Sequence, residues 1–259
     1  MATNTVYENK VIEAKAKDLL TTSVNTRNLM TIDNELAETE GMTKTINVYT
    51  YEGTAEELAI GAKNGTRGKI SYKGTDYTVK RVQQVFDYND ADFMKDNKIV
   101  DMMLKGANEV MVNKMTSDFI TEVKKATLSK EADVLSYDAI VDAISLLNKE
   151  DESEIFIVIP NAWKAELRKD EDYKTARMGE VIYNGQVGAI AGIPVIASNA
   201  LEDAAYVMTK EAVKLFMKKD VEVEQDRDIE AKENTVVLTT YYICALADAT
   251  QVCAITKTA

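Results

Sequence analysis

The sequence predicts an α+β fold, in which helices come early in the chain and strands come late. Helical patterns fill residues 90–149, whereas strand-like patterns dominate from residue 214 onward. The 259 residues include only 2 prolines and 11 glycines, and no Pro-rich or Ser/Gly-rich linker is present. Two domains would therefore have to interleave along the chain rather than hang on a tether.

The N-terminal residues 1–44 predict a loosely organised arm. Glu8–Leu20 carries apolar residues on neighbouring helical turns, which favours a helix. Thr21–Thr31 is rich in Thr, Asn and Ser and can bury little, so we expect it to be extended. Ile46–Tyr51 then alternates apolar and polar residues, as a half-buried strand does.

The next segment has the texture of a projecting β-hairpin. Lys69–Tyr72 and Tyr77–Lys80 flank the turn-like sequence Lys73–Asp76, which predicts a hairpin lying between Glu56 and Phe86. The segment holds too few apolar residues for a core of its own. We therefore expect it to project and pack on something else, with an ordinary edge hairpin as the alternative.

A long helix follows the hairpin. Asn89 or Asp90 can cap a first turn, and Lys95–Ala126 runs on without a proline, which predicts one continuous helix. Its apolar stripe at helical spacing consists of Ile99, Met103, Gly106, Val110, Met115, Phe119 and Val123. A narrow stripe of this kind suits a long helix that lies along a sheet.

A more compact region is predicted beyond residue 134. Ser136 caps a second amphipathic helix that extends to Lys149. The apolar run Ile155–Ile159 has the character of a central strand covered on both faces, and Pro160 ends it before another helix. The later strand-like runs are Lys214–Met217, Val221–Glu224, Val236–Tyr242 and Gln251–Ile255.

Composition excludes several classes of function. The chain has 43 acidic against 31 basic residues, a formal charge of -12, which disfavours tight binding to phosphate backbones. It contains no histidine, so the usual general base, the Ser-His and Cys-His nucleophile pairs and the commonest zinc ligand are missing. Cys244 and Cys253 lie in apolar surroundings and are interpreted as inert core thiols.

Targeting and membrane signals are also missing. No apolar run reaches the ~18 residues that a membrane-spanning helix needs. Residues 1–10 are polar and lack the apolar core of a signal peptide, so a cytoplasmic site of synthesis and assembly is expected.

Three motif-like segments fail as functional sites. Gly61–Lys69 lacks the spacing of a phosphate loop, and Gly185–Gly192 lacks that of a dinucleotide fingerprint. A strand that turns tightly on itself explains the latter glycines better. Asp87–Lys98 does not place calcium ligands where they are needed. The sequence thus predicts no catalytic, cofactor-binding or metal-binding residues and no enzyme activity.

The order of these parts resembles the major capsid proteins of tailed bacteriophages, which have the Hong Kong 97-like fold. In that family an N-terminal arm, a long hairpin called the E-loop and a spine helix precede an axial domain, and the chain then returns to a peripheral domain. Ile155–Trp163 resembles the family's central strand and following helix, and Ala191–Ser198 resembles its "G-x-P-V-x-x-S" stretch. The resemblance covers nearly the whole chain.

The resemblance implies a division of the chain into five parts. They are an N-terminal arm at 1–44, an E-loop hairpin region at 45–89, a spine helix of the peripheral domain at 90–133, an axial domain at 134–217 and return strands of the peripheral domain at 218–259. Only about 40 residues precede the E-loop, so the chain resembles family members without a fused scaffolding segment. Lys69 and Lys73 are candidates for intersubunit crosslinks, but no catalytic acid or acceptor is identified and crosslinking is not predicted.

The resemblance also implies a structural function. The chain would self-assemble through arm, E-loop and axial-domain contacts into hexamers and pentamers of an icosahedral virion capsid. That shell would form in the cytoplasm of a bacterial host. Its expected partners are other copies of itself, a separate scaffolding protein, a portal and double-stranded DNA enclosed without sequence-specific binding, with no membrane. The alternatives are an encapsulin-type cellular shell, a non-catalytic binding module, and an enzyme that uses only carboxylates and lysines.

Overall fold

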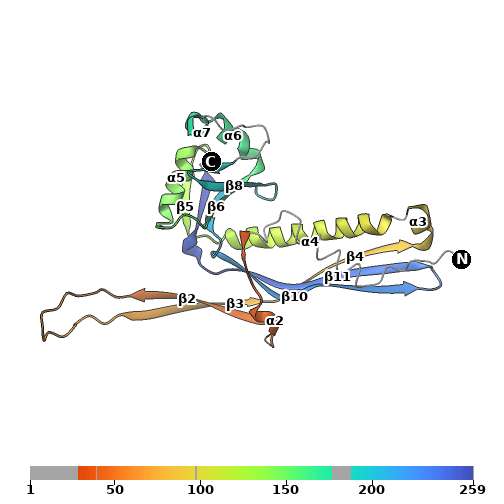
Figure 1. The fold of residues 1–259 in the computed structure, drawn as a ribbon, viewed down its shortest axis with the longest axis horizontal. Helices are drawn as coiled ribbons and strands as arrows, with labels where there is room; N and C mark the ends of the chain where they lie inside the picture. Colours follow the sequence, from red (N-terminus) through yellow and green to blue (C-terminus); the bar gives the residue numbers. More distant parts are fainter. Residues whose placement is uncertain (1–28, 39, 97, 177–187, 259) are drawn as a thin grey trace.

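The computed structural model describes residues 29–258 except 39, 97 and 177–187. Most of the predicted N-terminal arm, including the helix Glu8–Leu20, therefore lies outside the described residues. The fold comprises a four-stranded sheet, a six-stranded sheet, and a two-stranded hairpin that projects from the end of the first sheet (Figure 1).

The four-stranded sheet supports the long helix. Its strand order is β1-β10-β11-β4, with β1 parallel to β10 and the other neighbours antiparallel. The strands are β1 (Thr31–Asp33), β10 (Val213–Asp228), β11 (Glu233–Leu246) and β4 (Lys80–Asn89). The short helices α2 (Glu35–Glu38) and α3 (Asp90–Lys95) lie at opposite ends of this sheet, and α4 (Ile99–Val123) lies along one face (Figure 1).

The prediction of one helix from Lys95 to Ala126 is wrong at its start. Asn89 caps α3 as expected, its side chain accepting from the Asp92 amide at 2.7 Å. Asp96 then has an extended backbone, with φ -141° and ψ 107°, so α3 ends there. The Asp96 carboxylate accepts from the Lys98 amide at 2.9 Å, and α4 begins at Ile99 after this turn.

The buried stripe of α4 is also shifted from the predicted one. Gly106 and Val110 of the predicted stripe are exposed, and the buried residues of the first half include Val100, Leu104, Ala107 and Met111 instead. From Met115 onward, with Phe119 and Val123, the prediction is correct. Apolar residues lie on both sides of the first half of α4, so periodicity alone could not select the face.

The compact part contains the six-stranded sheet, with strand order β5-β12-β9-β6-β8-β7. Its strands are β5 (Leu128–Ala132), β12 (Val252–Lys257), β9 (Ala204–Thr209), β6 (Ile155–Pro160), β8 (Ile193–Ser198) and β7 (Ala189–Ile190). The helices of this part are α5 (Tyr137–Leu146), a 3-10 turn (Asn161–Trp163), α6 (Lys164–Lys169) and α7 (Glu171–Ala176). As predicted, Ser136 caps α5 and β6 is a buried central strand.

Alternate residues of β6 connect two cores. Ile155, Ile157 and Ile159 face the cluster formed with α5 and α6. Phe156 and Val158 belong to the cluster that α4 shares with the four-stranded sheet. The compact part and the long helix are therefore packed against each other through one strand that is buried on both faces.

Two predicted domain limits disagree with the strand pairing. Residues 218–259 were expected to return wholly to the peripheral sheet, but β12 pairs with β9 and β5 of the six-stranded sheet. β5 itself lies inside the segment 90–133 that was assigned to the spine helix. Conversely, β10 begins at Val213 and joins the four-stranded sheet before the predicted limit at 217. Strand partners are distant in sequence, so local patterns do not reveal them.

The turn between β7 and β8 offers a test of backbone strain. Ala191 has φ 50° and Gly192 has φ 83°, so the strand does turn tightly on itself. A left-handed conformation is unfavourable for Ala but tolerated by Asn. Ala191→Asn is expected to raise the free energy of unfolding by up to about 1 kcal/mol, measured by urea denaturation. Ala191→Val, which adds a β-branch at the same φ, should lower it.

Candidate assembly surface

The projecting hairpin consists of β2 (Thr43–Glu52) and β3 (Lys69–Thr78), which are antiparallel, and a connection of residues 53–68. It extends away from both sheets (Figure 1), and nearly all of its residues are exposed. A hairpin was predicted here, but the predicted turn at Lys73–Asp76 is wrong. Gly74 lies in the middle of β3, opposite Asn47.

The chemistry of Gly74 explains the error. A Cβ added to Gly74 would lie 2.9 Å from Asn47 Oδ1, so glycine here permits a close cross-strand approach rather than a turn. The strand that follows, β4, was placed in the hairpin region 45–89. It pairs instead with β11 in the four-stranded sheet.

One face of the hairpin carries four large exposed side chains. The register pairs Tyr49 with Tyr72 and Tyr51 with Ile70, and directly opposite residues of an antiparallel pair share a face. Their relative exposures are 66%, 71%, 68% and 67% in that order. The rings of Tyr49 and Tyr72 are 6.1 Å apart. We call Tyr49, Tyr51, Ile70 and Tyr72 the aromatic face.

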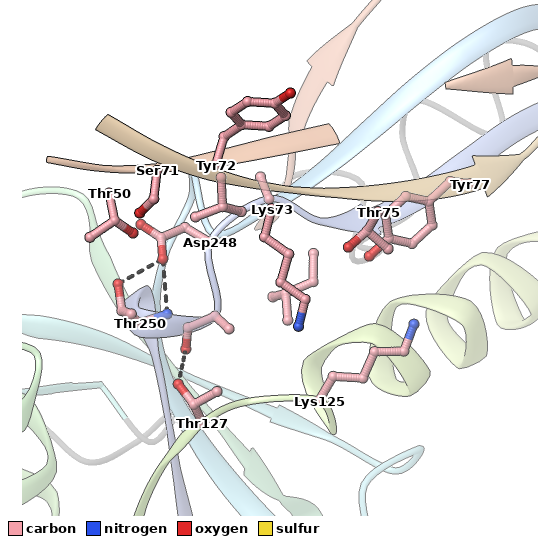
Figure 2. Close-up of a pocket in the computed structure, with 14 residues that line it drawn as sticks. Thr50, Ser71, Tyr72, Lys73, Thr75, Tyr77, Lys125, Thr127, Asp248 and Thr250 are labelled. Carbon is pink, nitrogen blue, oxygen red and sulfur yellow. Dashed lines mark hydrogen bonds between the residues drawn. The ribbon is translucent and has the colours of Figure 1, made fainter. Parts of the chain in front are cut away.

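The opposite face of the hairpin borders an open groove of about 520 Å³. Lys73 and Thr75 extend toward this groove, whereas the Tyr72 ring points away from it (Figure 2). The far wall is formed by Lys125 and residues 246–250. Its one carboxylate, Asp248, accepts from Thr250 and Gln251, so it is engaged in its own loop.

Two buried carboxylates lie on α4 beside the root of the hairpin. Asp118 accepts from Lys114 at 3.0 Å, from Lys80 at 3.1 Å and from the Tyr242 hydroxyl at 2.9 Å. Burial by itself raises the pKa of Asp118, but the hydrogen bonds from Lys114, Tyr242 and Lys80 outweigh it and hold the pKa below its ordinary value. Burial and the Asp118 charge strongly raise the pKa of Tyr242.

Glu122 lies one turn further along α4. The Lys125 ammonium is 2.7 Å from both carboxylate oxygens. Burial and the Glu122 charge raise the pKa of Tyr77 to about 12, so its hydroxyl remains a donor across the physiological range. Lys125 Nζ lies 5.4 Å from the centre of the Tyr77 ring.

Neither carboxylate belongs to a cluster of metal-ligand side chains in the described part of the chain. Within residues 29–258, gaps excepted, no group of three or more Cys, Asp or Glu side chains could hold a metal ion. In the same residues no helix is long and apolar enough to cross a membrane. The rejected motif Gly61–Lys69 lies at the outer end of the hairpin, and Asp87–Lys98 spans the end of β4 and the helix α3.

The sequence interpretation did not single out the aromatic face or the two buried carboxylates. The available signal was the presence of large side chains at every second position in Tyr49–Tyr51 and Ile70–Tyr72. Residues two apart in a strand share a face, so this alternation indicates one face rich in large side chains. Ile46–Tyr51 is a strand as predicted, but its tyrosines are exposed rather than half-buried. Of the crosslink candidates, Lys69 is the first residue of β3 and Lys73 borders the groove.

The two cysteines are buried and unpaired, as the sequence predicts. Burial, together with the charges of Glu122 and Asp118, raises the pKa of Cys244 to about 12, so little thiolate forms near neutrality. We expect a thiol reagent at pH 8 to label the folded protein only as fast as the protein opens. Replacing both with Ala should cost about 1–3 kcal/mol in total and leave assembly intact. Rapid stoichiometric labelling without denaturant would contradict this prediction.

The four-stranded sheet under a long helix, the projecting hairpin and the compact second sheet together form the Hong Kong 97-like capsid fold. The capsid of an empty GTA particle matches 91% of this chain and 90% of its own, with a TM-score of 0.72 and 11% identity. A structure from Mycobacterium phage Che8 matches 88% of this chain and 89% of its own, with a TM-score of 0.64 and 16% identity. A virus-like particle from Pyrococcus furiosus matches 96% of this chain and 100% of its own, with a TM-score of 0.65 and 12% identity.

The sequence itself is similar to the major capsid protein of Staphylococcus phage phiMR11. The two are 25% identical over 234 residues, which is 87% of this chain and 84% of that protein. No protein-family profile matches the chain. The similarity is thus to a phage head protein, in line with the sequence resemblance, and it does not favour the encapsulin-type alternative.

Proposed function

We propose that the chain is a major capsid protein whose function is to assemble into the icosahedral head of a tailed phage. The observation that carries this proposal is the aromatic face. Its four large side chains lie on a hairpin that projects from its own subunit, and each is about two-thirds exposed or more. An exposed apolar cluster of this kind is typical of a protein interaction site.

The expected contact energy suits repeated weak association. Fully burying one large apolar side chain contributes about 1.5–3 kcal/mol. Four such side chains would contribute about 6–12 kcal/mol, before the cost of fixing two subunits relative to each other is subtracted. Contacts of that size are individually reversible, and a closed shell accumulates many of them.

The charge of the chain fits a container for DNA. A formal charge of -12 gives a wall that does not hold phosphate tightly, so the packaged genome would remain free to move. The same charge makes the subunits repel one another, and added salt screens that repulsion. Assembly should therefore be favoured as ionic strength rises.

Several finer features belong to the same proposal. The division into arm, hairpin, spine helix, axial domain and peripheral strands is proposed, with β5 and β12 moved to the axial domain on account of their pairing. The shell is proposed to need a separate scaffolding protein and a portal, to enclose double-stranded DNA, and to form in the host cytoplasm. The role is structural rather than catalytic.

Negative-stain electron microscopy of the purified chain tests the proposal directly. Shells or capsomer rings are expected at high protein concentration, and more of them at 0.5 M than at 0.05 M salt. A matched variant replaces residues 53–68 with Asn-Gly, which suits the register of Glu52 opposite Lys69. Monomers in the wild type at every concentration and salt level, with no rings or shells, would contradict it.

A further inference from the structure

The outer end of the hairpin carries an Asn-Gly pair that neither packing nor backbone conformation explains. Asn64 and Gly65 lie in the connection 53–68, whose residues are all exposed and which is the part of the hairpin farthest from both sheets (Figure 1). Gly65 does not have a positive φ, and a Cβ added to it would meet nothing within 4 Å. Other residue types would therefore fit at this position.

An Asn-Gly pair has a reaction of its own. The backbone nitrogen of the residue after an asparagine can attack the carbon of the side-chain carboxamide, which closes a five-membered ring. Asparagine is therefore thermolabile, and a following glycine hinders the attack least because it has no Cβ. The rate depends on how the carboxamide, the attacking nitrogen and its proton acceptor are placed relative to one another.

The side chain of Asn64 is held in place for this attack. Its Oδ1 atom accepts a hydrogen bond from the Thr66 amide at 2.7 Å. This bond folds the carboxamide back toward the peptide bond between Asn64 and Gly65, which contains the attacking nitrogen. The same amide can stabilise the negative charge that develops on Oδ1 during the attack, as a donor in an oxyanion hole does.

A carboxylate lies at the attacking nitrogen. Glu56 Oε2 accepts from the Gly65 amide at 3.4 Å, and Glu56 Oε1 accepts from the Thr66 hydroxyl. The Thr66 hydroxyl thus positions the carboxylate, which can take the amide proton as the Gly65 nitrogen attacks. A distance of 3.4 Å is long for a hydrogen bond, but contacts to a general base commonly shorten only as the reaction proceeds.

We propose that Glu56, Asn64, Gly65 and Thr66 form a self-modification site at the outer end of the hairpin. The Gly65 nitrogen bonds to Asn64 Cγ and gives its proton to Glu56. The carboxamide C–N bond then breaks, and the leaving nitrogen takes the proton from Glu56 and departs as ammonia, which leaves a succinimide ring. Water opens the ring at either carbonyl, so that aspartate or isoaspartate with one new negative charge replaces Asn64.

The consequence for assembly rests on the proposed function. The reaction adds a negative charge to a subunit whose formal charge is already -12. Isoaspartate also lengthens the backbone by one carbon in the connection between the two strands that carry the aromatic face. Both changes oppose association between copies, so free subunits lose the ability to assemble as they age.

Two variants remove the base or its support. Glu56→Gln keeps the shape of the side chain and is expected to slow the loss of Asn64 by about tenfold or more. If Glu56 acted only through its charge, this change would instead speed the reaction, because a nearby negative charge disfavours removal of a proton. Thr66→Val keeps the backbone amide but removes the hydroxyl that positions Glu56, so it should also slow the reaction.

Two further variants serve as references. Glu57→Gln is the matched control, because it removes the neighbouring charge and leaves Glu56 in place; the rate should not change. Gly65→Ala adds a methyl group beside the attacking nitrogen in a space that is open, so the fold is kept and the reaction is slowed.

Mass spectrometry of the unassembled full chain measures the reaction. Purified protein at low concentration and low salt would be kept at a fixed pH and temperature, sampled over days and digested to peptides. Loss of ammonia and then gain of water is expected at Asn64, with a net mass increase of one dalton. Asn184–Gly185, the other Asn-Gly pair of the sequence, is an internal reference whose rate should be the same in every variant.

The outcomes are separable. Wild-type Asn64 that stays intact, or a rate that is equal or higher in Glu56→Gln, would overturn the site. If Glu56→Gln fails to fold, as judged by circular dichroism, an unchanged rate in Thr66→Val overturns it instead. Microscopy tests the consequence: aged wild-type protein should form fewer shells than equally aged Gly65→Ala, and equal assembly would overturn the effect of age. Fresh protein that forms no shells would contradict the proposed function and leave the chemistry standing.

Discussion

A chain whose aromatic face is made polar is expected to fold normally and to form no shells. The change is Tyr49→Ser, Tyr51→Ser, Ile70→Thr and Tyr72→Ser together. All four side chains are about two-thirds exposed or more in the subunit, so removing them costs little folding free energy. The contact they would bury in a shell contributes about 6–12 kcal/mol, which is enough to shift assembly below detection.

The measurement is light scattering and electron microscopy at matched concentration and salt, with circular dichroism and thermal melting to verify the fold. The control variant carries Val48→Thr and Lys73→Gln, which lie opposite each other on the other face of the same strands. It should assemble as the wild type does. Shells formed by the polar variant, or equal loss of assembly in the control, would show that the aromatic face is not the contact surface.

The parts of the fold that the sequence predicts well are those specified by neighbouring residues. Ser136 begins a helix because its side chain can accept from the Ala139 amide, an interaction within one turn. β6 is an unbroken run of large apolar residues, and such a run is stable only where both faces are covered. In each case the determinant lies within a few positions of the element that it determines.

The parts that the sequence predicts poorly depend on distant partners. β3 finds β2 across the 16 residues of 53–68, and no local signal states that Gly74 will stand opposite Asn47 rather than in a turn. The final strand β12 pairs with β9 rather than with the sheet that precedes it. Along α4 the sheet selects Met111 and leaves Val110 exposed, although both residues are apolar.

The candidate site shows the same limit. Asp118 and Tyr242 are 124 positions apart in the numbering, and neither residue type signals a contact with the other. The sequence contains no histidine, which lowers the expectation of general-base catalysis but does not indicate where a contact surface lies. Finding the aromatic face required the register of β2 and β3, because only pairing brings Tyr49 beside Tyr72.

The largest effect on stability is expected at Asp118. Asp118→Ala leaves the Tyr242 hydroxyl without its acceptor in a site that solvent does not reach, and leaves Lys80 and Lys114 without their partner. Removing one partner of a buried charged interaction lowers the free energy of unfolding by about 3–5 kcal/mol. The two lysines are about half exposed and can regain water, so Tyr242 should account for much of the loss.

A double-mutant cycle measured by urea denaturation tests this assignment. Tyr242→Phe removes the stranded hydroxyl, so Asp118→Ala combined with Tyr242→Phe should cost less than the sum of the two single changes. Lys114→Gln, with a half-exposed side chain, should cost under about 1 kcal/mol. Strict additivity of Asp118→Ala and Tyr242→Phe would show that the hydrogen bond between them contributes nothing.

The pH dependence gives an independent sign. Because the pKa of Asp118 is lower in the folded chain than the ordinary value of about 3.9, its contribution to stability is complete above that pH. It is lost as pH falls below about 4 and through the lower folded pKa, where the folded carboxylate takes up its proton. Unfolding free energies measured from pH 6 to pH 2 should therefore fall more steeply in the wild type than in Asp118→Asn. Parallel curves would mean that the lysines and Tyr242 do not favour the charged form of Asp118.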